Sequence, residues 1–177
     1  MGLGGGGWPG AFCVEHYLAP LLIDEADYGV GAYLRALECG YRGVSTKNCK
    51  GVFRSLLNRG LVAEDPQQRF QSAEDLTNLG AIALQQDLAT VLALGLPHVE
   101  RNGHQYFRGL DHLPAAEVRS ALEAHPDLYE RTRDGARLKI TAGNLNLETL
   151  DRPGYAHRVD VFPEERQALE PWLEALR

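Results

Sequence analysis

Between residues 21 and 100, short apolar runs alternate with segments of helical periodicity, and no other feature restricts the possible folds as much. One helical pattern ends at Gly40, a second at Gly60, and the longest runs from about Leu79 to Leu94 before Gly95. Strands that alternate with helices at such intervals indicate an α/β protein with βα units around a parallel sheet. The predicted strands are Leu21–Ile23, Arg42–Thr46, Arg69–Ala73 and Pro97–Glu100.

Each expected helix has an apolar side that predicts which residues are buried. The first helix carries Tyr33, Leu34 and Leu37. The second is expected to bury Val52, Phe53, Leu56 and Leu57 on one face, and the longest helix to bury Leu84, Leu88, Val91 and Leu92.

The composition indicates a globular chain and argues against several kinds of partner. The chain has 177 residues, of which 44% are hydrophobic and 24% charged. A net charge of −6 without a basic cluster argues against nucleic acid and anionic membranes as partners. No apolar run approaches the ~20 residues that a membrane-spanning helix needs. Three cysteines without a CxxC pair favour reduced thiols and a cytoplasmic protein.

Residues 1–20 form a glycine-rich or irregular start. Glycine costs too much backbone entropy for the run Gly4–Gly7 to favour a helix or a strand. Two explanations stay open, namely a flexible tail or expression remnant, and a coding start that differs from the original one. The segment has no basic stretch followed by an apolar one, so it does not resemble a secretory signal.

The last part of the chain, residues 113–177, has a different pattern from the βα units of residues 21–112. A helix is predicted from Ala115 to Ala124, with Pro114 in its first turn. Residues 138–141 and 145–147 read as a β-hairpin around Gly143. Residues 163–177 predict a terminal amphipathic helix whose apolar face packs on the body of the protein, with Leu169, Trp172, Leu173 and Leu176. The alternative is that this face docks on a partner, because the helix lies at a chain end.

Ionisable residues stand at the end of every predicted strand. In parallel βα folds the carboxyl ends of the strands share one side of the sheet, where functional groups gather. Polar loops and helix caps also place carboxylates there, so a single such residue means little, whereas four strand ends in succession are notable. The residues are Asp24 and Glu25, Lys47 and Lys50, Glu74 and Asp75, and Glu100.

Such a set of groups suits proton abstraction next to a carboxylate. Carboxylate oxygens are ligands that suit Mg²⁺, and the metal would neutralise the charge that develops on an enediolate. A partly desolvated lysine near a divalent cation is expected to have a lowered pKa, which would allow it to act as a base.

These strand ends resemble segments of the enolase superfamily, in its mandelate-racemase and muconate-lactonising branches. Leu22-Ile23-Asp24-Glu25 resembles the end of the fifth strand of that family's barrel, and Gly43 to Val52 resembles the sixth-strand segment with its lysine and following glycine. Ser72 to Leu76 is similar to the seventh strand. Gly143 to Leu147 followed by Pro153-Gly154 resembles the C-terminal return segment.

The resemblance covers roughly residues 21–160 and is greatest to mandelate-racemase-like proteins, through Lys47-Asn48-Cys49-Lys50-Gly51 and the segment His98 to His104. It implies the C-terminal portion of a (β/α)8 barrel, with strands five to eight.

The resemblance also implies a role for each residue of the predicted site. Asp24 would be a metal ligand with Glu25 beside it, Mg²⁺ would be the cofactor, and Lys47 would be the acid/base residue. Glu74 and Glu100 would be catalytic residues that line the pocket. The substrate would be a small carboxylate in a racemase, dehydratase or cycloisomerase reaction.

This sequence departs from the family's pattern in what it lacks. The capping domain, the second-strand lysine motif and the two earlier metal-binding carboxylates are absent. One ligand of three binds Mg²⁺ poorly, so we expect the chain alone to be inactive or nearly so. The alternative is a non-catalytic remnant or a partner-dependent subunit. Exposed sheet edges would then pair with a second copy or with a missing N-terminal half.

Two further patterns have weaker functional readings. His98, Glu100 and His104 invite a zinc site, but their spacing is not HExxH and solvated loop histidines explain them better. Cys49 lies between Lys47 and Lys50, yet no histidine base is near in sequence, so it reads as an ordinary reduced thiol.

Overall fold

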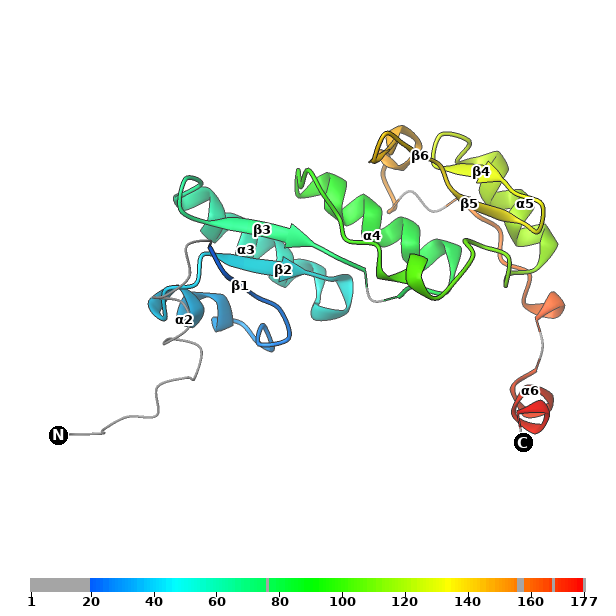
Figure 1. Cartoon of the computed structure of the whole chain (residues 1–177), viewed down its shortest axis with the longest axis horizontal. Helices are drawn as coiled ribbons and strands as arrows, with labels where there is room; N and C mark the ends of the chain where they lie inside the picture. Colours follow the sequence, from blue (N-terminus) through cyan, green and yellow to red (C-terminus); the bar gives the residue numbers. More distant parts are fainter. Residues whose placement is uncertain (1–19, 76, 156–157, 167, 177) are drawn as a thin grey trace. The chain divides into compact units, whose positions relative to one another are not determined.

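The computed structural model describes residues 20–75, 77–155, 158–166 and 168–176, and the predictions for residues 1–19 lie outside these ranges. The chain divides into two compact units (Figure 1). The first takes the chain up to Leu76 together with Ala93–Glu100, and the second takes Thr77–Leu92 and Arg101–Arg177. The protein is therefore a mixed α/β protein, and its two units are described one at a time.

Three parallel strands form the sheet of the first unit. They are β1 (Leu22–Ile23), β2 (Gly43–Thr46) and β3 (Phe70–Ala73), and their order in the sheet is their order in the chain (Figure 1). Leu22 pairs with Gly43, and Gly43 pairs with Phe70. The first three predicted strands are thus confirmed, and they form the parallel sheet that the alternation predicted.

The fourth predicted strand, Pro97–Glu100, is reduced to a single parallel bridge between Glu74 and Glu100. The Glu100 N–H donates to the Ala73 carbonyl at 2.8 Å, and the Asp75 N–H donates to the Glu100 carbonyl at 3.1 Å. Glu100 therefore takes the position of a fourth strand beside β3 through its backbone.

The helices α2 (Ala32–Glu38) and α3 (Val52–Glu64) both pack on one face of the sheet. Successive strand residues point to opposite faces. Ile23 and Val44 are paired neighbours on the same face, and both belong to one buried cluster with side chains of the two helices. The members of the cluster are Ile23, Tyr33, Ala36, Val44 and Val62.

The apolar face predicted for α3 is wrong. Phe53 is 84% exposed, and Leu56 and Leu57 are also exposed, whereas Ser55, Asn58 and Val62 are buried. Polar partners lie on the inner side, where Asn58 Nδ2 donates to Asp27 Oδ2 at 3.4 Å and Gln71 of β3 donates to the backbone carbonyl of Ser55 at 3.0 Å. Gly60 does not end the helix either, which continues to Glu64.

The second unit contains most of α4 (Ala81–Ala93) and all of α5 (Ala115–Ala124). The bounds of α5 are those that the sequence predicted, although Pro114 precedes the helix as its N-cap. Leu88, Ala121 and Leu128 are fully buried in this unit. No helix among the described residues is long and apolar enough to cross a membrane.

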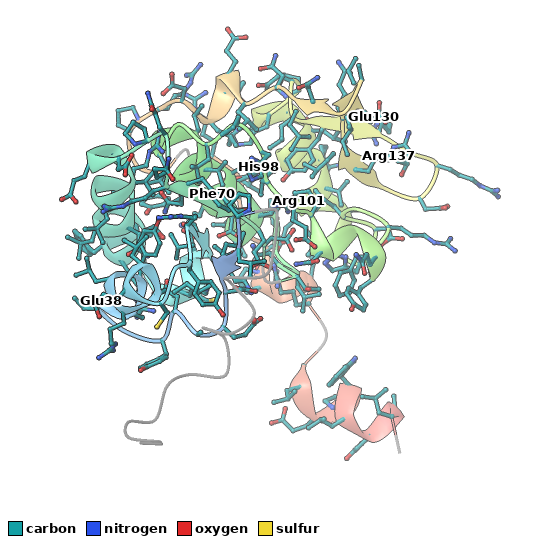
Figure 2. The ribbon with its side chains drawn as sticks, turned by 60° about the vertical axis from the view of Figure 1, so that its left-hand side comes forward. Glu38, Phe70, His98, Arg101, Glu130 and Arg137 are labelled. Carbon is teal, nitrogen blue, oxygen red and sulfur yellow. The ribbon has the colours of Figure 1, made fainter. Side chains whose placement is uncertain are left out.

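Two small antiparallel hairpins follow α5, and the sequence predicted one of them. β6 (Ile140–Thr141) and β7 (Asn144–Leu145) form the predicted hairpin, with positive φ at Ala142 and Gly143 as a tight hairpin turn requires. β4 (Tyr129–Arg131) and β5 (Ala136–Leu138) were not predicted. Glu130 and Arg137 pair across this second hairpin at 2.7 Å (Figure 2).

The prediction that the terminal helix packs on the body through its apolar face is wrong. The helix α6 covers only Leu169–Ala175, and Leu169, Trp172, Leu173 and Leu176 are exposed. The segment before it is held by a charged pair instead. The buried Glu117 carboxylate accepts two hydrogen bonds from Arg166 Nη2 at 2.7 Å and one from the Phe162 N–H at 3.1 Å.

Candidate functional site

Four of the five predicted site residues meet at the carboxyl ends of the strands. The Lys47 ammonium follows β2 and lies 3.1 Å from a carboxylate oxygen of Asp24 and 3.1 Å from one of Glu74. Glu25 is more distant, at 3.5 Å. Lys47 is only 7% exposed, so its charge is compensated by these carboxylates rather than by water. The predicted convergence of Asp24, Lys47 and Glu74 is therefore observed.

Asp24, Lys47 and Glu74 continue the face of the sheet opposite to α2 and α3. Leu22, Gly43 and Phe70 share a row on this face, and the next residues on the same face are Asp24, Ser45 and Ser72. Phe70 lies so close over Gly43 that a Cβ there would stand 2.4 Å from its ring. Figure 2 labels Phe70 and His98 in this part of the unit.

Two residues outside the predicted set complete the cluster. Ser45 Oγ donates to Glu74 Oε1 at 2.5 Å. Lys50 Nζ donates to Asp24 Oδ1 at 2.8 Å, to the Asp24 carbonyl at 2.9 Å and to the Ser45 carbonyl at 3.2 Å. Ser45 is a residue of β2 and stands two residues before Lys47, which directly follows the strand, so period-two spacing would have placed it on the same face.

Glu25 and Glu100 are at the margin of the cluster. The Glu25 side chain is 85% exposed, so its contact with Lys47 is screened by water. Glu100 joins β3 through its backbone and its side chain is exposed. Neither position has the enclosed environment of Lys47 and Glu74.

The arrangement shifts the pKa of Lys47 and of Asp24 in opposite directions. Burial alone would lower the pKa of Lys47, but hydrogen bonds to Glu74 and Asp24 outweigh it and raise the pKa above its usual 10.5. Burial alone would raise the pKa of Asp24, but hydrogen bonds from Lys50 and Lys47 lower it from 3.8 to about 2. The lowered lysine pKa expected from a divalent cation is thus opposed by the side chains around Lys47.

The described residues do not fit Mg²⁺. This ion requires close to octahedral oxygen ligation at about 2.1 Å, and Asp24 Oδ1 is already within 2.8 Å of one ammonium group and 3.1 Å of another. Glu25 is largely exposed, and no group of three His, Cys, Asp or Glu side chains suited to a metal occurs within the described ranges. In this cluster, lysine ammonium groups take the place that a cation would need.

The alternative sites considered from the sequence find no further support. His98 Nε2 lies 3.0 Å from Ser72 Oγ, and the side chain of His104 is outside the described set. Cys49 is exposed.

Comparison with known proteins gives no match to a family model, to a curated protein or to a solved structure.

Proposed function

We propose that this chain provides part of an enzyme active site that transfers a proton at the carbon next to a carboxylate. The proposed reaction is of the racemase, dehydratase or cycloisomerase type found in the enolase superfamily. The observation that supports this most is the position of Lys47 Nζ, 3.1 Å from both Asp24 and Glu74 at the ends of adjacent parallel strands.

The order of the strands supports the barrel part of the proposal. Chain order and sheet order coincide for β1, β2 and β3, and the two intervening helices pack on the same face. An open doubly wound sheet has helices on both faces and reverses its strand order, whereas a (β/α)8 barrel keeps sequential order with helices outside. The site face would then be the interior of the barrel.

The proposed roles follow from the contacts of each side chain. Lys47 first releases one ammonium proton to solvent, its neutral Nζ then takes the proton from the substrate α-carbon, and the positive charge restored on Lys47 stabilises the enolate that forms. Asp24 and Glu74 hold the ammonium in position, and Ser45 orients Glu74. Glu25 and Glu100 would line the exposed side of the pocket.

Exchange of the substrate α-proton in deuterated water tests this proposal. Exchange needs only one proton-transferring group, so we expect slow exchange with a panel of small 2-hydroxycarboxylates even if full turnover is absent. Lys47→Met should reduce the exchange rate by about 10²-fold or more. The matched control is Lys139→Met, at an exposed lysine of the second unit, which should leave the rate unchanged.

Exchange that is absent for every carboxylate, or that is equal in the wild type and Lys47→Met, would contradict the proposal. A ¹H NMR time course measures it directly.

The second candidate is a non-catalytic subunit in which the cluster only holds the strand ends together. The contacts of Lys50 favour it, because its three N–H groups are used by Asp24 and the Ser45 carbonyl. The exposed apolar face of α3 also suits a partner-dependent protein. Lys47→Met would then lower stability, and no exchange would be seen with any variant.

A further inference from the structure

Among the described residues, no strand pairs with the outer side of either edge of the sheet in the first unit. β1 is at one edge, and in the described part of the chain no strand pairs with its outer side. Glu100 occupies the other edge, beside β3. Exposed edges of a parallel sheet pair readily with another chain, and closure into a barrel removes both at once.

The sheet of the first unit has half the number of strand positions that an eight-stranded barrel needs. β1, β2, β3 and the Glu100 position make four parallel positions in sequential order, and α2 and α3 pack on one face of this sheet. Eight parallel strands form a barrel whose interior is just filled by side chains. Two such sheets related by a twofold axis along the strands remain parallel, and each brings its β1 edge to the Glu100 edge of the other.

An apolar hollow next to β1 gives a place for the second copy to pack. It has a volume of about 170 Å³ and is lined by residues of β1 and α2, among them Ile23, Ala32 and Ala36. Tyr28, on its rim, is exposed. A mainly apolar hollow lined by β1 and α2 suits a strand and helix that arrive from a neighbouring copy.

We propose that two copies of this chain close a single eight-stranded parallel barrel through their first units, with β1 of each copy beside residues 98–100 of the other. The inference deepens the proposed function and rests on it for the site. Each copy supplies one Lys47–Asp24–Glu74 cluster, and the two clusters form opposite walls of one pocket at the carboxyl ends of the strands. A single copy leaves that pocket open on one side.

The mass in solution is the first test. Light scattering at tens of micromolar should give twice the 19.5 kDa mass of one chain. Leu22→Pro should return the mass to that of one chain. The Leu21 carbonyl accepts from β2, so in a parallel strand the Leu22 N–H points to the open edge, and proline removes only that outer donor.

Cross-linking tests the geometry without depending on the proline variant. In a background with Cys13, Cys39 and Cys49 replaced by serine, Leu22→Cys chains are mixed with Val99→Cys chains and treated with a short bismaleimide. We expect a covalent dimer. The control replaces Val99→Cys by Phe53→Cys on the exposed face of α3, which should give none.

These experiments distinguish a failure of the dimer inference from a failure of the proposed function. A monomeric mass overturns the inference, as does a dimer that fails to join positions 22 and 99 or that Phe53→Ser dissociates. A complex with a different protein at these edges also overturns it. Lys47→Met leaves both edges intact and should stay dimeric, so a dimer without proton exchange rejects the proposed function and leaves this inference standing.

Discussion

Lys47 is nearly fully buried and faces three carboxylates, so its ammonium group should matter for stability whatever the function. Removing one partner of a buried charge cluster leaves the others uncompensated, which typically costs about 3 kcal/mol. We expect Lys47→Met to lower the free energy of unfolding by roughly that amount. Urea denaturation at pH 7 measures it.

The matched control is Lys139→Met, since Lys139 is exposed and should change stability by less than about 0.5 kcal/mol. A Lys47→Met variant as stable as this control would mean that Lys50 and Ser45 compensate the carboxylates alone.

His125 predicts a pH dependence in the second unit. The imidazole is fully buried, and its Nδ1 lies 2.8 Å from Thr149 Oγ1, whose own hydrogen goes to Asp127 Oδ1 at 2.6 Å. Burial lowers the pKa of His125 below 6.5, with Asp127 acting in the opposite direction. The unfolded chain therefore takes up a proton at a pH at which the folded chain does not.

This difference in proton uptake sets the direction in which the free energy of unfolding changes with pH. The free energy of unfolding should fall as the pH drops below about 6.5, and the loss should level off below the pKa of the folded state. His125→Asn should flatten this part of the profile, whereas His98→Gln, at an exposed histidine of the first unit, should leave it unchanged. Denaturant titrations between pH 7.5 and pH 4.5 would show it. Equal slopes for His125→Asn and the wild type would refute the assignment.

At the level of elements, α3 is a helix whose apolar residues are mostly not its buried residues. Phe53 and Leu57 are exposed on this helix, while Val62 is buried in the core of the first unit. Val62→Ala should cost about 2 kcal/mol, through two lost methyl contacts and the cavity they leave. Phe53→Ser and Leu57→Ser should each change the free energy of unfolding by less than about 0.5 kcal/mol. The reverse ranking in urea denaturation would restore the face predicted from the sequence.

The strands and most helices could be predicted because their signals are local. Short apolar runs located β1, β2 and β3, and helical periodicity with glycine or proline at the ends located α2, α4 and α5. The orientation of α3 could not be predicted, because it depends on polar partners distant in sequence, such as Asp27 for Asn58. The β4–β5 hairpin was missed although Asp134-Gly135 is a hairpin turn signal, since its strands are three residues long and carry charges.

The centre of the site could also be predicted from the sequence, and its margin could not. Strand-end position brought Asp24, Lys47 and Glu74 together from sequence alone. The exposure of Glu25 and the use of Lys50 to neutralise Asp24 depend on how the loops after β1 and β2 turn, which strand spacing does not specify.

At the scale of the whole molecule, two compact units share one chain that passes between them more than once. The helix α4 shows that the units do not follow the order of the chain, because Ala81 to Leu92 belong to the second unit although they stand between two segments of the first. Gln85 of α4 donates to the buried Tyr129 hydroxyl at 3.3 Å, which ties the helix to β4. We therefore expect α4 to unfold together with the second unit, which it contacts, and not with the segments of the first unit that flank it in the sequence.

Hydrogen exchange followed by mass spectrometry tests this with two core variants. Leu128→Ala, at a fully buried side chain of the second unit, should raise exchange in residues 101–150 and also in α4. Val44→Ala, at an equally buried side chain of the first unit, should raise exchange in residues 20–75 and leave α4 protected. The two variants make the same kind of cavity, so a difference between their patterns reports where cooperativity ends. If α4 responds to Val44→Ala as strongly as β2 does, the units unfold as one, and the division between them has no energetic meaning.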